Sequence, residues 1–149
     1  MQDKKLSPHF TLSELTASDT AARQNIDNTP SPEIEANLAL VAATLEKVRA
    51  IAGKPIVVTS GYRCAALNKA VGGAADSYHV KGLAADINRP GSTPYEFGQD
   101  IIAAGIEFDQ LIHEFGRWVH IGLPVPGQKP RKQLLTIKTG TGYMQGWLK

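Results

Sequence analysis

The feature that most constrains the fold is one long amphipathic helix that the sequence predicts over residues 32–52. Ser31 is a favourable N-cap, Pro32 suits the first helical position, and Gly53 suits the residue after the last turn. Apolar residues recur between these signals in alternating steps of four and three: Ile34, Leu38, Val41, Leu45 and Val48. This spacing is typical of a helix with one buried stripe.

Short apolar runs after this helix predict strands. Residues 56–59 and 83–87 are each expected to form a buried strand, and residues 134–137 an edge strand. Residues 108–112 and 118–123 flank Phe115-Gly116-Arg117, a pattern that favours a β-hairpin. We could assign no structure to the glycine-rich tail from Thr139.

Three further helices are expected. Thr11 with Glu14, and Thr93 with Glu96, have the spacing of capping boxes and predict helices over 12–17 and from 93 to Gly105. A short helix over 65–70 is expected within the long segment 60–77, whose length is typical of functional loops. Helices and strands are therefore mixed, and we expect an α+β fold with a small, mostly antiparallel sheet and helices packed on one side.

Composition excludes several classes of protein. The length of 149 residues suits one domain over 1–149. A net charge of +2 without a basic run argues against a nucleic-acid-binding protein. No run approaches a membrane span, residues 1–5 lead into no apolar segment typical of a signal peptide, and the single Cys64 excludes an intramolecular disulfide. We expect a monomer.

Three polar residues in or beside apolar runs suggest a metal site. His79 precedes Asp86 by seven residues, and Asp86 lies within the apolar run 83–87, where a carboxylate is costly unless it is paired or bound to a metal. His120 lies in the apolar run 118–121. Two imidazoles and one carboxylate, with a fourth position open, are the ligands of a catalytic zinc ion. Coincidental histidines are the competing interpretation.

Two charged residues are candidates for catalysis. In the predicted hairpin, Glu114 shares a face with His120, so it can act as general base on a water molecule at the metal. The alternative is a solvated glutamate at the end of the hairpin. Arg63 lies in the segment Ser60-Gly61-Tyr62-Arg63 that directly follows a predicted strand, and its guanidinium suits a carboxylate or a developing oxyanion. His113 is expected on the opposite face from Glu114.

These patterns together resemble the M15 family of zinc peptidases, which includes D-Ala-D-Ala carboxypeptidases and murein endopeptidases with the hedgehog-type fold. The resemblance covers roughly residues 10–138. It rests on Ser60-Gly61-Tyr62-Arg63, on Asn68 with Val71-Gly72-Gly73, on Ser77-x-His79-x-x-Gly82-x-Ala84-x-Asp86, and on Trp118-Val119-His120.

The resemblance implies that His79, Asp86 and His120 bind Zn²⁺. It implies that Arg63 binds substrate and polarises the scissile carbonyl, and that Ser77 lines the substrate pocket. Many members place the catalytic acid three residues before the last histidine, where this chain has Arg117. Relatives in the smaller branch have a glutamate six residues before that histidine, which matches Glu114.

The expected function is therefore zinc-dependent hydrolysis of peptide bonds in peptidoglycan stem peptides or crossbridges, by carboxypeptidase or endopeptidase action. The short chain resembles phage-encoded wall-degrading proteins such as endolysins, so we expect it to act on the bacterial cell wall or in the periplasm. Because Arg117 stands where many M15 members have the catalytic acid, a second hypothesis stays open: the chain is a zinc-containing wall-binding or phage structural module that catalyses no hydrolysis.

Overall fold

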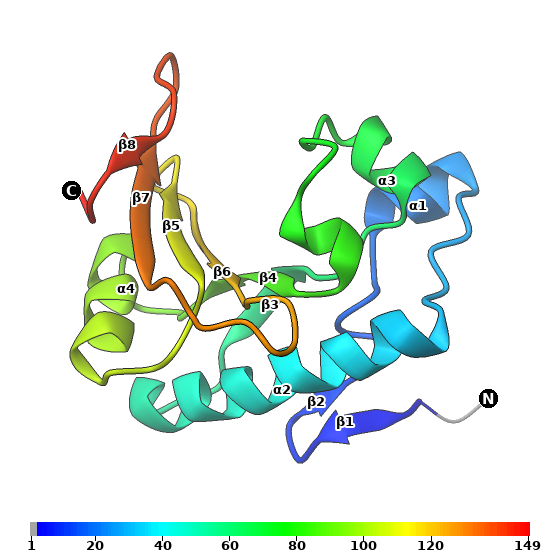
Figure 1. The fold of residues 1–149 in the computed structure, drawn as a ribbon, viewed down its shortest axis with the longest axis horizontal. Helices are drawn as coiled ribbons and strands as arrows, with labels where there is room; N and C mark the ends of the chain where they lie inside the picture. The colour runs from blue at the N-terminus through cyan, green and yellow to red at the C-terminus, as the bar shows by residue number, and fades with distance from the viewer. Residues whose placement is uncertain (1–2) are drawn as a thin grey trace.

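A computed structural model describes residues 3–149 of the chain, and Figure 1 shows its fold. Its elements are β1 (Lys5–Ser7), β2 (Phe10–Thr11), α1 (Asp19–Gln24), α2 (Pro32–Ala52), β3 (Val57–Ser60), α3 (Ala65–Ala70), the 3₁₀ turn η1 (Tyr78–Lys81), β4 (Ala84–Asn88), α4 (Pro94–Ala103), β5 (Gln110–Glu114), β6 (Trp118–Gly122), β7 (Gln133–Ile137) and β8 (Met144–Gln145).

The main sheet has six strands in the order β3-β4-β6-β5-β7-β8. Only β5 and β7 pair in parallel, and the other neighbours in this sheet pair antiparallel. Helices α2 and α4 contact each other and the central strands, while α1 and α3 are grouped at the other end of the molecule (Figure 1). The expected α+β fold with a small, mostly antiparallel sheet is confirmed.

The core lies between this sheet and α2 and α4. It contains one face of the sheet, including Ala85, Ile87, Val119 and Ile121. Because side chains alternate along a strand, Asp86 and His120 face the other way, away from this core. The opposite face of β4, β6 and β5 is therefore available for a site.

Helix α2 forms as the sequence predicts. The Ser31 hydroxyl accepts a hydrogen bond from the backbone N–H of Ile34, and Gly53 has a φ of +73° at the C-cap. Leu38, Val41, Leu45 and Val48 are fully buried, and Ile34 packs partly against the core. The predicted stripe is therefore the face that α2 buries.

The predicted helix over 12–17 is wrong. The Thr11–Glu14 capping contacts do form, but residues 12–16 make only turns, and the helix α1 begins after the Ser18 cap. The carbonyl of Leu15 accepts a hydrogen bond from the N–H of Tyr62 at 2.7 Å instead of from a following helical turn. A tertiary contact with the chain after β3 thus replaces the local helix.

Two strand predictions need correction. The strand predicted over 56–59 is β3, which lies at the edge of the sheet with Val57 47% exposed, so it is not a buried strand. The predicted edge strand 134–137 is β7, which is internal because β8 covers its free side. The glycine-rich tail from Thr139, for which the sequence predicts no structure, contributes this covering strand.

The hairpin of β5 and β6 is confirmed, and its turn sets the geometry of the site. Phe115 and Gly116 both have positive φ values, 56° and 64°. The register pairs Glu114 with Trp118 and Ile112 with His120. These four residues share one face of the hairpin.

Candidate active site

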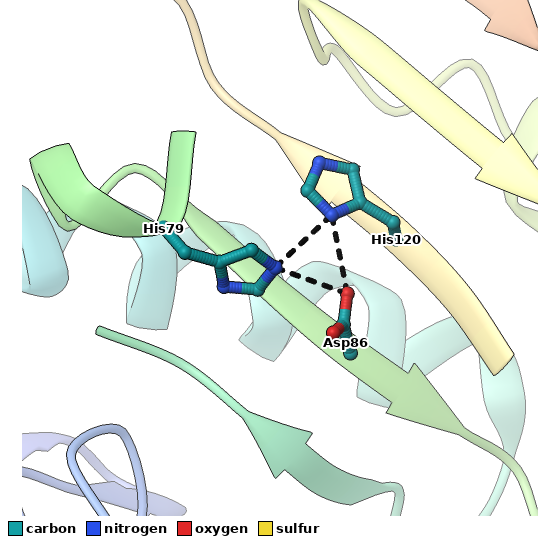
Figure 2. Close-up of side chains that lie close together, drawn as sticks. All are labelled: His79, Asp86 and His120. Atoms are coloured by element: carbon teal, nitrogen blue, oxygen red, sulfur yellow. Dashed lines mark hydrogen bonds and ion pairs between the residues drawn. The ribbon is translucent and has the colours of Figure 1, made fainter. Parts of the chain in front are cut away.

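Three side chains from different elements converge at one point (Figure 2). His79 comes from η1, Asp86 from β4 and His120 from β6, and all three are buried. His79 Nε2 lies 3.2 Å from Asp86 Oδ1 and 3.2 Å from His120 Nδ1. His120 Nδ1 lies 3.1 Å from Asp86 Oδ1. These three atoms, each able to donate an electron pair to a metal ion, form a nearly equilateral triangle; they are called the donor atoms below.

The strand register and one glycine bring these donors together. Antiparallel pairing of β4 with β6 sets Asp86 directly opposite His120. Gly82, with a φ of +69°, ends η1 and turns the chain into β4, so that His79 folds back over the strand. A Cβ at Gly82 would lie 2.8 Å from Ile34 Cγ2, so both the backbone conformation and the packing favour glycine.

The hydrogen bond behind His79 fixes its tautomer. His79 Nδ1 lies 2.7 Å from the carbonyl oxygen of Gly61. A carbonyl oxygen can only accept, so Nδ1 carries the proton and donates it. In the neutral ring, Nε2 then presents its lone pair toward Asp86 and His120. A second partner that orients the ring in this way is usual for histidines that bind metals.

The two imidazoles also favour the ionised form of Asp86. Burial opposes ionisation, but His79 and His120, when their rings are protonated, outweigh it through their charge and hydrogen bonds and hold the pKa of the Asp86 carboxyl well below its usual range. The carboxylate is thus available as a ligand.

The geometry fits a small divalent cation. Zinc binds nitrogen and carboxylate oxygen at about 2.0–2.2 Å, so two ligands of a tetrahedral site lie about 3.3–3.6 Å apart. The observed separations of 3.1–3.2 Å need only slight expansion. Three protein ligands of this chemistry leave a fourth position for water or substrate.

Glu114 lies on the same face of the hairpin as His120 and lines the same cleft. Burial raises the pKa of the Glu114 carboxyl; His120 opposes this effect and Asp86 adds to it. A carboxyl whose pKa is raised toward neutrality is a stronger base than an exposed glutamate. The side chain is half-buried, so it is not simply a solvated residue at the end of the hairpin.

Arg63 and Ser77 line the cleft beside the donors. Arg63 Nη2 donates a hydrogen bond to Ser77 Oγ at 3.3 Å, and the backbone N–H of Arg63 donates to the His79 carbonyl at 3.1 Å. Ser77 Oγ also accepts from the backbone N–H of His79 at 3.2 Å and so caps η1. The structure therefore brings together all six residues that the sequence singled out.

The comparison with protein families agrees with this geometry. The family model for peptidase M15 matches residues 8–122. The chain belongs to the peptidase M15 family. No protein with a curated description matches the chain. Family membership makes the chain a peptidase by class, with a peptide as the class of substrate.

In this M15 chain, the donors and their neighbours surround a cleft of about 570 Å³. Its lining includes the three donor residues, Arg63, Ser77 and Glu114. An apolar margin surrounds them: Val71, Phe115, Trp118, Leu135 and Tyr143. Three buried nitrogen atoms of cleft residues have no hydrogen-bond partner among the described residues: Arg63 Nε, Trp118 Nε1 and His120 Nε2. Unsatisfied buried polar groups are costly, so water molecules or a ligand in the cleft would stabilise them.

Sequence reasoning missed a network that braces the site. The Tyr78 hydroxyl donates a hydrogen bond to Asp109, and Arg131 contacts both residues, with Arg131 Nη2 2.7 Å from the Tyr78 hydroxyl. The Tyr78 ring meets the His120 ring edge-on at 6.4 Å between centroids. One signal was present, because Asp109 is a carboxylate within the predicted strand segment 108–112.

His113 takes no part in the site. As expected, it faces away from Glu114, where its Nδ1 lies 2.8 Å from the Leu148 carbonyl oxygen and its ring lies near Trp147. A carbonyl oxygen can only accept, so Nδ1 donates.

Within residues 3–149, no helix is long and apolar enough to cross a membrane.

Proposed function

We propose that this M15 peptidase is zinc-dependent and hydrolyses peptide bonds in bacterial peptidoglycan. One observation carries the proposal: two imidazole nitrogens and one carboxylate oxygen lie 3.1–3.2 Å apart, and the lone pair of His79 is directed between them. His79, Asp86 and His120 would hold the ion. A zinc ion held there would act as a Lewis acid that acidifies water and polarises a carbonyl.

Glu114 is the proposed general acid and base. Its place on the His120 face of the hairpin, in the lining of the same cleft as the three proposed metal ligands, supports this role. Its raised pKa suits a group that first accepts a proton from water and then donates it to the leaving amine. General acid–base catalysis of this kind contributes a rate factor of about 10²–10⁴.

Arg63 and Ser77 are the proposed substrate-binding residues. Arg63 is a permanent cation beside the donor triangle, and its Nε atom has no partner within the described chain. It can hold the scissile carbonyl and stabilise negative charge on the carbonyl oxygen as water adds. Ser77 fixes the guanidinium through its hydroxyl group.

The test is digestion of purified peptidoglycan by the zinc-loaded protein, followed by mass spectrometry, with a control treated with EDTA. We expect new fragments that disappear with EDTA, and their masses identify the bond. Loss of a terminal residue indicates a carboxypeptidase, and cleavage within a stem or crossbridge indicates an endopeptidase. Adding the zinc-loaded protein to intact bacterial cells from outside, and measuring the fragments released and the lysis of the cells, tests the proposed action on the cell wall and a phage-like lytic role.

A second candidate is a zinc-containing module that binds the wall without cleaving it. One observation favours it: Arg117 occupies the position three residues before His120 where many M15 members have the catalytic acid, and it is exposed in the hairpin turn. This candidate predicts bound zinc and retention on sedimented peptidoglycan, with no fragments released from several wall types.

A further inference from the structure

The C-terminal tail crosses from one face of the sheet to the other around its β8 edge. β8 pairs with β7 so that Gln145 lies opposite Leu135 and Met144 opposite Thr136. Leu135 lines the cleft, so by alternation Gln145 and Tyr143 lie on the cleft face. Tyr143 is itself one of the residues that line the cleft. Trp147, two residues after β8, packs against the core on the opposite face.

Trp147 anchors this tail firmly. Its indole N–H donates a hydrogen bond to the Tyr95 carbonyl at 3.0 Å, and its ring lies 5.3 Å from that of His113. Gly98 provides the room, because a Cβ there would lie 1.8 Å from Trp147 Cζ2. The backbone N–H of Leu148 adds a hydrogen bond of 2.9 Å to Thr136 Oγ1. The tail is thus fixed on the helix side of the sheet.

Tyr143 is held over the cleft without being needed for packing. It is 61% exposed, the highest value among the exposed large hydrophobic residues of the described chain. Partial burial raises the pKa of its phenol, and the negative charges of Glu114, Asp86 and Asp76 add to the effect, so the hydroxyl stays protonated. An exposed ring with a protonated hydroxyl suits an amphipathic partner in the cleft.

The margin of the cleft extends this surface. Val71 and Phe115 are also exposed large apolar residues, and they line the same cleft as Tyr143. An apolar margin around a polar centre matches a peptide, which has apolar side chains and a polar backbone. Tyr143 lies beyond residues 8–122, the part of the chain that the M15 family model covers. The family match therefore assigns no role to Tyr143.

We propose that Tyr143 is a substrate-binding residue. Its ring packs on the peptide held in the cleft, and its hydroxyl donates a hydrogen bond to a carbonyl or carboxylate of that peptide. Trp147 is the positioning residue that holds the tail in place. The proposal rests on the proposed function for the identity of the peptide, a peptidoglycan stem or crossbridge peptide.

The experiment measures cleavage and binding separately. Kinetic constants are measured for the zinc-loaded wild type, Tyr143→Ala, Tyr143→Phe and Trp147→Ala on soluble muropeptides prepared from the peptidoglycan. Dissociation constants for the same muropeptides are measured by calorimetry in a Glu114→Gln background. Leu40→Ala, which removes an exposed apolar side chain from α2, is the matched control. Zinc content and melting temperature are recorded for every variant.

We expect Tyr143→Ala to raise KM and Kd about tenfold with kcat changed less than about threefold, because it removes a contact made equally in ground and transition states. Tyr143→Phe keeps the ring and should show an intermediate increase. Trp147→Ala should reproduce the increase in KM and also lower the melting temperature, while zinc content stays at one per chain. Leu40→Ala should behave as the wild type.

Unchanged KM and Kd in Tyr143→Ala overturn the assignment and leave the peptidase function standing. A wild type that binds muropeptides without cleaving them, and loses that binding in Tyr143→Ala, supports the assignment while the proposed hydrolysis fails. A wild type that does not bind muropeptides overturns the assignment as well. Loss of zinc or of folding in Tyr143→Ala, with normal behaviour of Tyr143→Phe, indicates a structural role and also contradicts it.

Discussion

Zinc should raise the thermal stability of this chain, and the structure sets the expected size of the effect. The three donor atoms already lie 3.1–3.2 Å apart, so binding requires little rearrangement of the folded chain. In the unfolded chain the site is absent, since His79 and His120 are 41 residues apart in sequence. A ligand that binds only the folded state stabilises it by about 4 kcal/mol at a free concentration of about 1,000 times its Kd.

This free energy converts into a measurable shift. At about 2–4 °C per kcal/mol for chains of about this length, we expect zinc to raise the melting temperature by about 8–16 °C. Differential scanning calorimetry of the zinc-loaded protein and of protein dialysed against EDTA gives the two values. The comparison requires a stated free zinc concentration, because the shift depends on the ratio of that concentration to Kd.

Two histidine variants make this prediction specific. His120→Ala removes one of the three donors and should abolish most of the response to zinc. His113→Ala is the matched control, because His113 is a buried histidine of the same hairpin on the opposite face. It should lower the melting temperature yet keep the full response to zinc. A response that survives in His120→Ala, or disappears in His113→Ala, would refute the reasoning.

Two further predictions concern stability. Burial raises the pKa of Glu46, but hydrogen bonds from Ser7 and His9 outweigh it, so the folded-state pKa is lowered. The stability that Glu46 contributes is therefore present above about pH 4.3, the ordinary glutamate value, and is lost as the pH falls through the lower folded value. Glu46→Gln should make acid unfolding, followed by circular dichroism, less steep, and an unchanged curve contradicts this. Gly122→Ala places a Cβ 2.8 Å from the Tyr78 ring and should cost about 1–3 kcal/mol in urea unfolding, whereas an unchanged midpoint contradicts the close packing.

The elements that carry the site could be predicted because their signals are local. The stripe of α2, the capping box of α4 and the turn at Phe115 and Gly116 are each set by residues within a few positions. The register of the hairpin follows from its turn, so the common face of Glu114 and His120 could be inferred from the sequence.

The remaining features depend on contacts that the sequence does not display. The carbonyl of Leu15 accepts a hydrogen bond from the N–H of Tyr62, 47 positions later in the chain, and this contact replaces the helix predicted over 12–17. Arg131 reaches Asp109 across 22 positions, and β8 is only two residues long, too short to show a periodic pattern. For the same reason the sequence does not predict the position of Tyr143 over the cleft, which depends on Trp147 and Gly98.

The most direct test of the central claim compares two zinc-loaded proteins on the same purified peptidoglycan. Wild type and Glu114→Gln are each shown to hold one zinc ion per chain, and the fragments they release are counted by mass spectrometry over time. The proposed mechanism predicts peptide fragments from the wild type and a rate at least about 10²-fold lower from Glu114→Gln. Equal rates from both proteins would contradict the role of Glu114, and no fragments from the zinc-loaded wild type would contradict the peptidase function itself.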